Sequence, residues 1–114
     1  MKIYISIPIS GHDIEVQRAK AKKVEEALKA RGHEVVNPFD TPYPDEVMSP
    51  EEQWCYFMGE DMKRLLACDG VIFCSQWHKS KGCSIEHIVA RECKLDRYYD
   101  MSNVPVLNIQ DIRP

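Results

Sequence analysis

The chain has 114 residues, of which 44% are hydrophobic, and its formal net charge is −3. This length fits one domain, so we expect a single domain over residues 1–114 whose folding buries roughly 60 to 70% of the surface of the unfolded chain. The charge balance lacks the basic excess typical of proteins that bind nucleic-acid polymers, and it excludes that class. A small anionic ligand remains compatible, because it needs only a few local donors.

The cysteines bear on the cellular compartment. Five lie at positions 55, 68, 74, 83 and 93, with no CxxC pair and no secretory signal before them. This usage predicts reduced thiols in a cytoplasmic protein. A metal site from His78, Cys83 and His87 is an alternative, but the spacing matches no familiar zinc pattern. No apolar run has membrane-spanning length, so we expect neither a metal nor a membrane partner.

The first half of the chain predicts a strand, a helix and a second strand. Residues 2–7, KIYISI, are mostly apolar and β-rich, which is typical of a buried strand. Apolar residues at helical spacing predict a helix over 13–31, which ends at Gly32. HEVVN, residues 33–37, predicts a second strand. The proline-rich segment 38–49 predicts a long loop, either a surface connection or the edge of a site.

The second half continues the alternation. The segment Ser49-Pro50-Glu51-Glu52 has the residues of a capping box and predicts a helix that runs to about Cys68. GVIFC, residues 70–74, predicts a third strand. A helix over about 83–95 and a last strand over 103–109 follow.

Strands that alternate with helices predict an α/β fold, here a Rossmann-like (flavodoxin-like) parallel sheet of four to five strands with helices on both faces. Such sheets bind ligands at the carboxyl ends of their strands, so we expect a site among the loops 7–13, 37–49 and 75–84. The first loop, with Ser6, Ser10 and backbone amides near a helix start, is a general anion-binding arrangement. It is neither a P-loop nor a GxGxxG fingerprint.

Three side chains are candidates for chemistry. Glu86 lies in SKGCSIEHIVA, in the first turn of its predicted helix, where an acid near the positive end of the helix dipole is ordinary. Ile85 and Val89 must face the sheet, however, so Glu86 should point towards the strand ends, where a carboxylate can act as nucleophile or base. Asp61 is either a solvated mid-helix acid or has another role that outweighs its poor helix propensity. Tyr4 is either core packing or a buried hydroxyl that needs a partner.

Three motifs carry a family resemblance through their order and spacing: IYISIPISG, DMKRLLACDGVIF and SKGCSIEHIVA. Together they resemble the nucleoside 2-deoxyribosyltransferase superfamily over most of the chain. The similarity is greatest to its small uncharacterised bacterial and phage members and to the 2'-deoxynucleoside 5'-phosphate N-hydrolases. The resemblance implies cleavage or transfer at the N-glycosidic bond of a nucleoside or its 5'-monophosphate. It also implies no cofactor and assembly as a homo-oligomer, for which the candidate interface aromatics are Trp54, Tyr56, Phe57 and Trp77.

The resemblance also implies roles for single residues. Glu86 falls on the nucleophile, Asp61 on the acid that assists the leaving base, and Tyr4 on the tyrosine that orients the nucleophile. Ser80 falls where the transferases have an Asp that holds the sugar 5'-hydroxyl and the nucleotide hydrolases have a serine on the 5'-phosphate. Because a carboxylate would repel a phosphate, Ser80 favours a monophosphate substrate. The other substrate contacts expected are Gly82, Ser6, Pro8, Ser10 and Gly11.

Two positions depart from the family pattern. Ile7 stands where these families usually have a glycine, which lets a ligand approach the backbone closely. Ser10 stands where the nucleotide hydrolases carry an arginine. Ile7 favours an alternative, a non-catalytic nucleotide-binding module or sensor that retains the fold. A third option is an enzyme that acts on another ribosyl nucleotide, such as an NAD glycohydrolase. A chain of this length leaves little room to bind a full dinucleotide.

Overall fold

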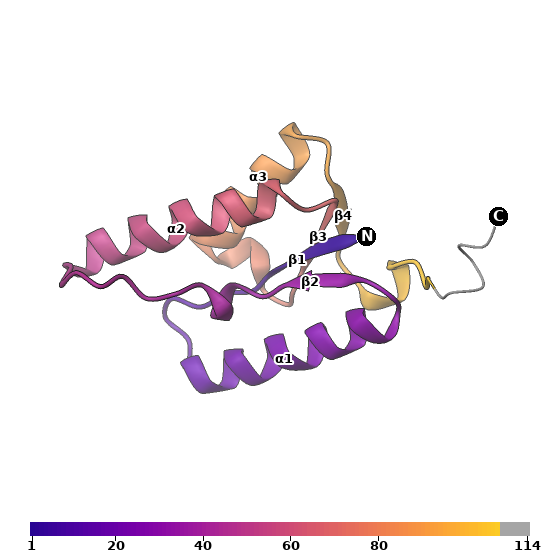
Figure 1. The fold of residues 1–114 in the computed structure, drawn as a ribbon, viewed down its shortest axis with the longest axis horizontal. Coiled ribbons are helices and arrows are strands. Elements are labelled where there is room, and N and C mark those ends of the chain that lie inside the picture. The colour runs from indigo at the N-terminus through magenta and orange to yellow at the C-terminus, as the bar shows by residue number, and fades with distance from the viewer. Residues whose placement is uncertain (108–114) are drawn as a thin grey trace.

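A four-stranded parallel sheet forms the centre of the computed structural model, which describes residues 1–107 (Figure 1). Its strands are β1 (Lys2–Ser6), β2 (Glu34–Val36), β3 (Gly70–Phe73) and β4 (Asp96–Tyr98). They lie in the order β2-β1-β3-β4, and each neighbouring pair is parallel. This order is the flavodoxin-like one, which confirms the predicted α/β fold.

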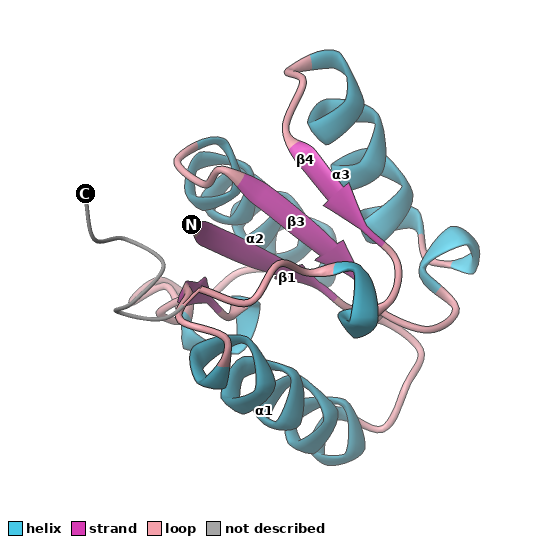
Figure 2. Ribbon diagram, turned by 90° about the vertical axis from the view of Figure 1, so that its right-hand side faces the viewer, coloured by secondary structure: helices cyan, strands magenta, loops and turns pink. Residues whose placement is uncertain are grey.

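Three helices cover the sheet on both faces (Figure 2). The helix α1 (Ile14–Ala30) lies on one face, while α2 (Pro50–Leu66) and α3 (Lys81–Glu92) lie together on the other. Short 3-10 helices occur at Pro38–Asp40, Trp77–Lys79 and Met101–Asn103. The predicted capping box at the start of α2 is present, with Ser49 and Glu52 each bonded to the other's backbone amide. Within residues 1–107, no helix combines the length and apolarity needed to cross a membrane.

The core has two layers because β1 sends alternate side chains to opposite faces of the sheet. Ile3 and Ile5 pack in the layer that contains Leu28 of α1. Tyr4, between them, packs in the other layer with Leu65 of α2. The same alternation turns Ser6, the last residue of β1, towards α2 and α3.

The last strand was predicted wrongly. Residues 101–103 form a 3-10 helix and 104–107 are irregular, whereas 108–109 lie outside the described residues. The fourth strand is instead Asp96–Tyr98, which pairs with β3 at the sheet edge. Its three residues are polar and largely exposed, so it has no apolar run to mark it in the sequence.

The third helix also starts earlier than predicted. It spans Lys81–Glu92 rather than about 83–95, because the side chain of Ser80 caps it by accepting from the Cys83 amide at 3.3 Å. Glu86 therefore lies in the second turn of α3, and its predicted place in the first turn is wrong. A glutamate at this point is beyond the free amides of the helix start.

Two adjacent leucines of α2 test the packing of this face. Leu65 is fully buried whereas Leu66 is 51% exposed. We expect Leu65→Ala to lower the free energy of unfolding by about 2 to 5 kcal/mol, through lost apolar burial and a cavity. Leu66→Ala, the matched control, should change it by less than about 1 kcal/mol. Urea denaturation of both variants checks this, and equal losses would contradict the packing described.

Candidate active site

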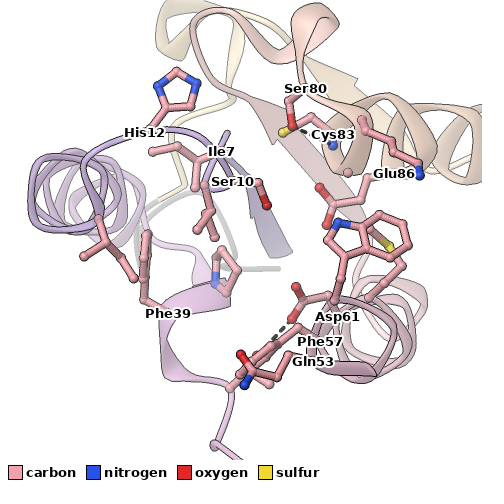
Figure 3. Close-up of a pocket in the computed structure, with 18 of the residues that line it drawn as sticks. Ile7, Ser10, His12, Phe39, Gln53, Phe57, Asp61, Ser80, Cys83 and Glu86 are labelled. Carbon is pink, nitrogen blue, oxygen red and sulfur yellow. Dashed lines mark hydrogen bonds between the residues drawn. The ribbon is translucent and has the colours of Figure 1, made fainter. Parts of the chain in front are cut away.

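A cavity of about 560 Å³ opens at the carboxyl ends of β1 and β3 (Figure 3). Its wall contains residues of each of the three loops predicted to form a site, together with residues of α2 and α3. In this strand order the chain leaves β1 and β3 towards opposite faces of the sheet. A crevice forms between such strands and is the usual ligand site of the fold.

Glu86 is a buried carboxyl on this wall. It is 5% exposed, and its Oε1 accepts a hydrogen bond from the Ser6 hydroxyl at 2.7 Å. Burial raises its pKa from 4.5 to about 7, and the nearby charge of Asp61 acts in the same direction. The Tyr4 and Ser6 hydroxyls oppose this rise because they stabilise the ionised form. Glu86 therefore gains or loses its proton near neutral pH.

Asp61 is held by a chain of donors rather than solvated. The Thr41 hydroxyl donates to its Oδ1 at 2.9 Å, and Arg64 Nη1 donates to the Thr41 oxygen at 2.6 Å. Burial raises the pKa of Asp61, whereas Thr41 and the charge of Arg64 lower it. Lys63, a possible partner by its position in the sequence, instead pairs with Glu60 at 3.3 Å.

Tyr4 connects the two acids. Its side chain is fully buried and, within residues 1–107, its hydroxyl has no hydrogen-bond partner of good geometry. Burial raises its pKa well above 10.0, and the charges of Glu86 and Asp61 raise it further. A buried hydroxyl beside two carboxyls is a donor available to either of them.

Three of the six residues predicted to contact substrate line the cavity: Ser10, Ser80 and Gly82. Ser6, Pro8 and Gly11 do not line it. Ser6 lies behind the wall and bonds Glu86, whereas the carbonyl of buried Pro8 accepts from Gln17 Nε2 at 2.6 Å. Gly11 adopts φ 80°, a left-handed turn conformation that favours glycine.

Ile7 lies both in the core and on the cavity wall. It is 5% exposed and packs in the layer beneath α1, and its remaining surface faces the cavity. The structure therefore places it on the inner wall, across from Glu86 in Figure 3. Since glycine would leave more space there, Ile7 narrows the cavity on this side.

Several residues of the cavity wall were not expected from the sequence, above all Arg18, whose side chain stacks on an aromatic ring. The guanidinium of Arg18 lies 5.0 Å from the centre of the Phe39 ring, and Lys81 Nζ lies 4.7 Å from that of Trp54. Arg18 follows cavity-lining Ile14 by one helical turn, a spacing that could have indicated it. With Lys79, also on the wall, these cations give a positive rim to a protein of negative net charge.

The aromatics proposed for an interface have mixed positions. Trp54 and Phe57 line the cavity, whereas Trp77 packs against the core layer beneath α2 and α3 and stacks on His87 at 4.3 Å between ring centres. The alternative metal site does not form as a cluster, because within residues 1–107 no three His, Cys, Asp or Glu side chains are placed to hold a metal ion. Cys83 lines the cavity, and His87 Nε2 bonds the Tyr99 hydroxyl at 2.7 Å.

Comparison with known proteins places the chain in a family. Residues 1–99 match the family described as "Domain of unknown function (DUF4406)". The chain belongs to this DUF4406 family. No curated protein matches the sequence.

The fold of this DUF4406 member is similar to that of a 2-deoxyribosyltransferase from the psychrotolerant bacterium Bacillus psychrosaccharolyticus. The TM-score is 0.68 over 96% of this chain and 94% of the other, at 16% sequence identity. At this identity, the likeness establishes a shared fold.

The raised pKa of Glu86 makes a prediction about stability. An acid whose folded pKa, about 7, exceeds its unfolded value, 4.5, keeps its proton in the folded state while the unfolded chain loses it. The contribution of Glu86 to stability is therefore greatest below pH 4.5 and falls as the pH rises towards 7. Glu86→Gln should abolish this loss, making the variant more stable than wild type by about 3 kcal/mol at pH 8 and by little at pH 4.5.

Urea denaturation at the two pH values measures this difference. Glu92→Gln is the matched control, because the Glu92 side chain is 68% exposed on the same helix. It should leave the pH dependence of wild type unchanged. A Glu86→Gln variant that follows the wild-type pH dependence would contradict the burial of an acid with a raised pKa.

Proposed function

We propose that this protein cleaves or transfers at the N-glycosidic bond of a nucleoside 5'-monophosphate or nucleoside, with Glu86 as the nucleophile. The observation that carries the proposal is the meeting of Glu86, Asp61 and Tyr4 at one cavity, with the pKa of both carboxyls raised. Most glycosidases use a pair of carboxyl side chains to break the glycosidic bond. The similarity of the fold to a 2-deoxyribosyltransferase supports the proposal.

The first step is a displacement at the anomeric carbon. The ionised carboxylate of Glu86 attacks C1' while the bond from C1' to the base nitrogen breaks, through an oxocarbenium-like transition state. Asp61, in its protonated form, donates its proton to the departing base. A glycosyl ester on Glu86 results, and the Tyr4 hydroxyl orients the attacking carboxylate.

The second step returns the enzyme to its initial state. Water attacks C1' of the ester, gives its proton to Asp61 and yields the free sugar phosphate, which is hydrolysis. A second base attacking in place of water gives transfer. In both cases the bond between C1' and Glu86 breaks, and the carboxylate is regenerated.

The cavity wall supports a phosphorylated substrate with an aromatic base. Arg18, Lys79 and Lys81 supply positive charge, and the Ser80 hydroxyl adds a donor without the repulsion of an acid. Phe39 and Phe57 offer apolar faces on which a base can stack. A monophosphate therefore suits the wall better than an uncharged nucleoside.

A substrate screen tests the proposal. The protein is incubated with the 5'-monophosphates and nucleosides of each base, in ribose and deoxyribose forms, and base release is followed by chromatography. We expect release from at least one monophosphate and a loss of at least about 1,000-fold in Glu86→Ala, because the nucleophile is removed. Glu92→Ala is the control and should keep wild-type activity. Undiminished release by Glu86→Ala would refute the proposal.

The contribution of Arg18 tests the substrate class. Removing a cation that meets a phosphate costs about tenfold or more in binding, so Arg18→Gln should raise KM for the active monophosphate about tenfold. It should leave KM for the corresponding nucleoside unchanged. Lys23→Gln, which removes an exposed cation of α1 that does not line the cavity, is the control. Equal effects of Arg18→Gln on both substrates would argue against a phosphate at this rim.

Ile7 favours a second candidate function, a nucleotide-binding module or sensor without turnover. Its side chain occupies wall space that a substrate sugar would need to approach the backbone. Under this alternative, calorimetry would detect nucleotide binding that Glu86→Gln leaves unchanged, with no base released from any substrate.

A further inference from the structure

We propose that Ser6 is a positioning residue that fixes the orientation of Glu86 through its hydroxyl. The inference rests on the proposed function, in which Glu86 attacks the sugar. It assigns to Ser6 a contact with the nucleophile rather than with the substrate. The geometry that carries it is the 2.7 Å hydrogen bond from Ser6 Oγ to Glu86 Oε1, between two buried residues 80 positions apart in the chain.

The backbone of Ser6 is rigidly placed. It pairs with Phe73 in the register of β1 and β3, and its carbonyl accepts from the Cys74 amide at 2.9 Å. The sheet therefore determines where the hydroxyl lies, and the hydroxyl determines where Oε1 lies. With Oε1 held from behind, Oε2 is the oxygen left to meet the anomeric carbon.

A structural role alone explains Ser6 poorly. The residue is fully buried at the end of a central strand, between Ile5 and Ile7. At such a position an apolar side chain packs better, and a buried hydroxyl stabilises only if it is hydrogen-bonded. Its partner here is the carboxyl of Glu86, whose ionised form is disfavoured by burial. Ser6 thus favours the state of Glu86 that the proposed attack requires.

Other groups also face Glu86, and the test must separate Ser6 from them. The Tyr4 hydroxyl on β1 lowers the pKa of Glu86, and the charge of Asp61 on α2 raises it. Two thiols, Cys74 after β3 and Cys83 on α3, lie near enough to sense its charge. Ser6 also lowers the pKa of the Cys83 thiol, so a substitution at Ser6 changes the surroundings of this thiol as well as those of Glu86.

The first measurement is the titration of Glu86 by NMR of the protein labelled with ¹³C at the glutamate carboxyls, with Glu86→Gln used to assign the signal. Ser6→Ala removes the donor, and Ser6→Cys keeps nearly the same shape with a much weaker donor. Both should raise the Glu86 pKa by about one unit, the value of a hydrogen bond to a charged group. Ser6→Thr keeps the hydroxyl and should titrate close to wild type.

The control is Ser84→Ala, two residues before Glu86 on the same helix. Its hydroxyl donates to the His78 carbonyl at 3.4 Å and is not part of the cavity wall. This variant should leave the titration unchanged. A Glu86 titration that is the same in wild type, Ser6→Ala and Ser6→Cys would overturn the positioning role.

The second measurement is the pH dependence of kcat/KM, which reports the ionisations of the free enzyme, on the substrate found in the screen. In Ser6→Ala the acid limb should move to higher pH by the same amount as the Glu86 pKa, with kcat lowered more than KM is raised. A shifted Glu86 titration in a protein that releases no base supports the contact and refutes the proposed function. If the protein is active but Ser6→Ala has the same pH profile and the same Glu86 titration as wild type, the role of Ser6 is refuted and the proposed function is not.

Discussion

The alternation of side chains along β1 is the constraint on which the site depends. Because Ile3 and Ile5 must face α1, Tyr4 and Ser6 must face α2 and α3. The two polar side chains of the strand thus project onto the face where Glu86 and Asp61 arrive from separate helices. A shift of one residue in the register of β1 would exchange the faces, burying the isoleucines against the acids and the hydroxyls against α1.

Burying Glu86 opposes folding, and the rest of the structure offsets this effect. The rise of its pKa to about 7 corresponds to about 3 kcal/mol at neutral pH. The burial of one leucine such as Leu65 contributes a free energy of similar size. The free energy contributed by apolar burial in the two core layers is therefore several times larger than the cost of burying this one acid. A chain selected for stability alone would have an apolar residue at position 86, so the acid indicates a site.

Sequence patterns predicted the parts of this architecture that have strong local signals. The apolar strands β1 and β3, the capping box of α2 and the location of a cavity among three loops all follow from periodicity and turn chemistry. The strand β4 could not be found, because its residues Asp96–Tyr98 are polar and its pairing with β3 is a tertiary effect. The start of α3 was missed because Ser80 was considered for substrate contact and not as a helix cap.

The residues of the site likewise divide into those that the sequence predicted and those that it did not. The grouping of Tyr4, Asp61 and Glu86 was expected from the resemblance to the nucleoside 2-deoxyribosyltransferase superfamily, which rests on the order and spacing of three motifs. Thr41 and Arg18 were not expected, because each reaches the cavity through a side-chain contact that no local pattern encodes. Ser6 was expected at the substrate, and only the strand register reveals that its hydroxyl meets Glu86 instead.

The two carboxyls are supported by hydroxyls of different strength, and this asymmetry matters for the proposed reaction. Thr41 is backed by the guanidinium of Arg64, so its bond to Asp61 stabilises a charged carboxylate. Within residues 1–107 no cation bonds the Ser6 hydroxyl, and Glu86 is the more buried acid. Burial thus favours a proton on Glu86, whereas the proposed reaction requires Glu86 ionised and Asp61 protonated.

The proposed reaction therefore needs groups that stabilise the ionised form of Glu86. Tyr4 lies beside both acids, and among the residues that the structure describes its buried hydroxyl has no other partner, so it can donate to whichever carboxyl is ionised. The unpaired hydroxyl of Tyr4, unfavourable for stability, thus has a physical reason within the proposed chemistry.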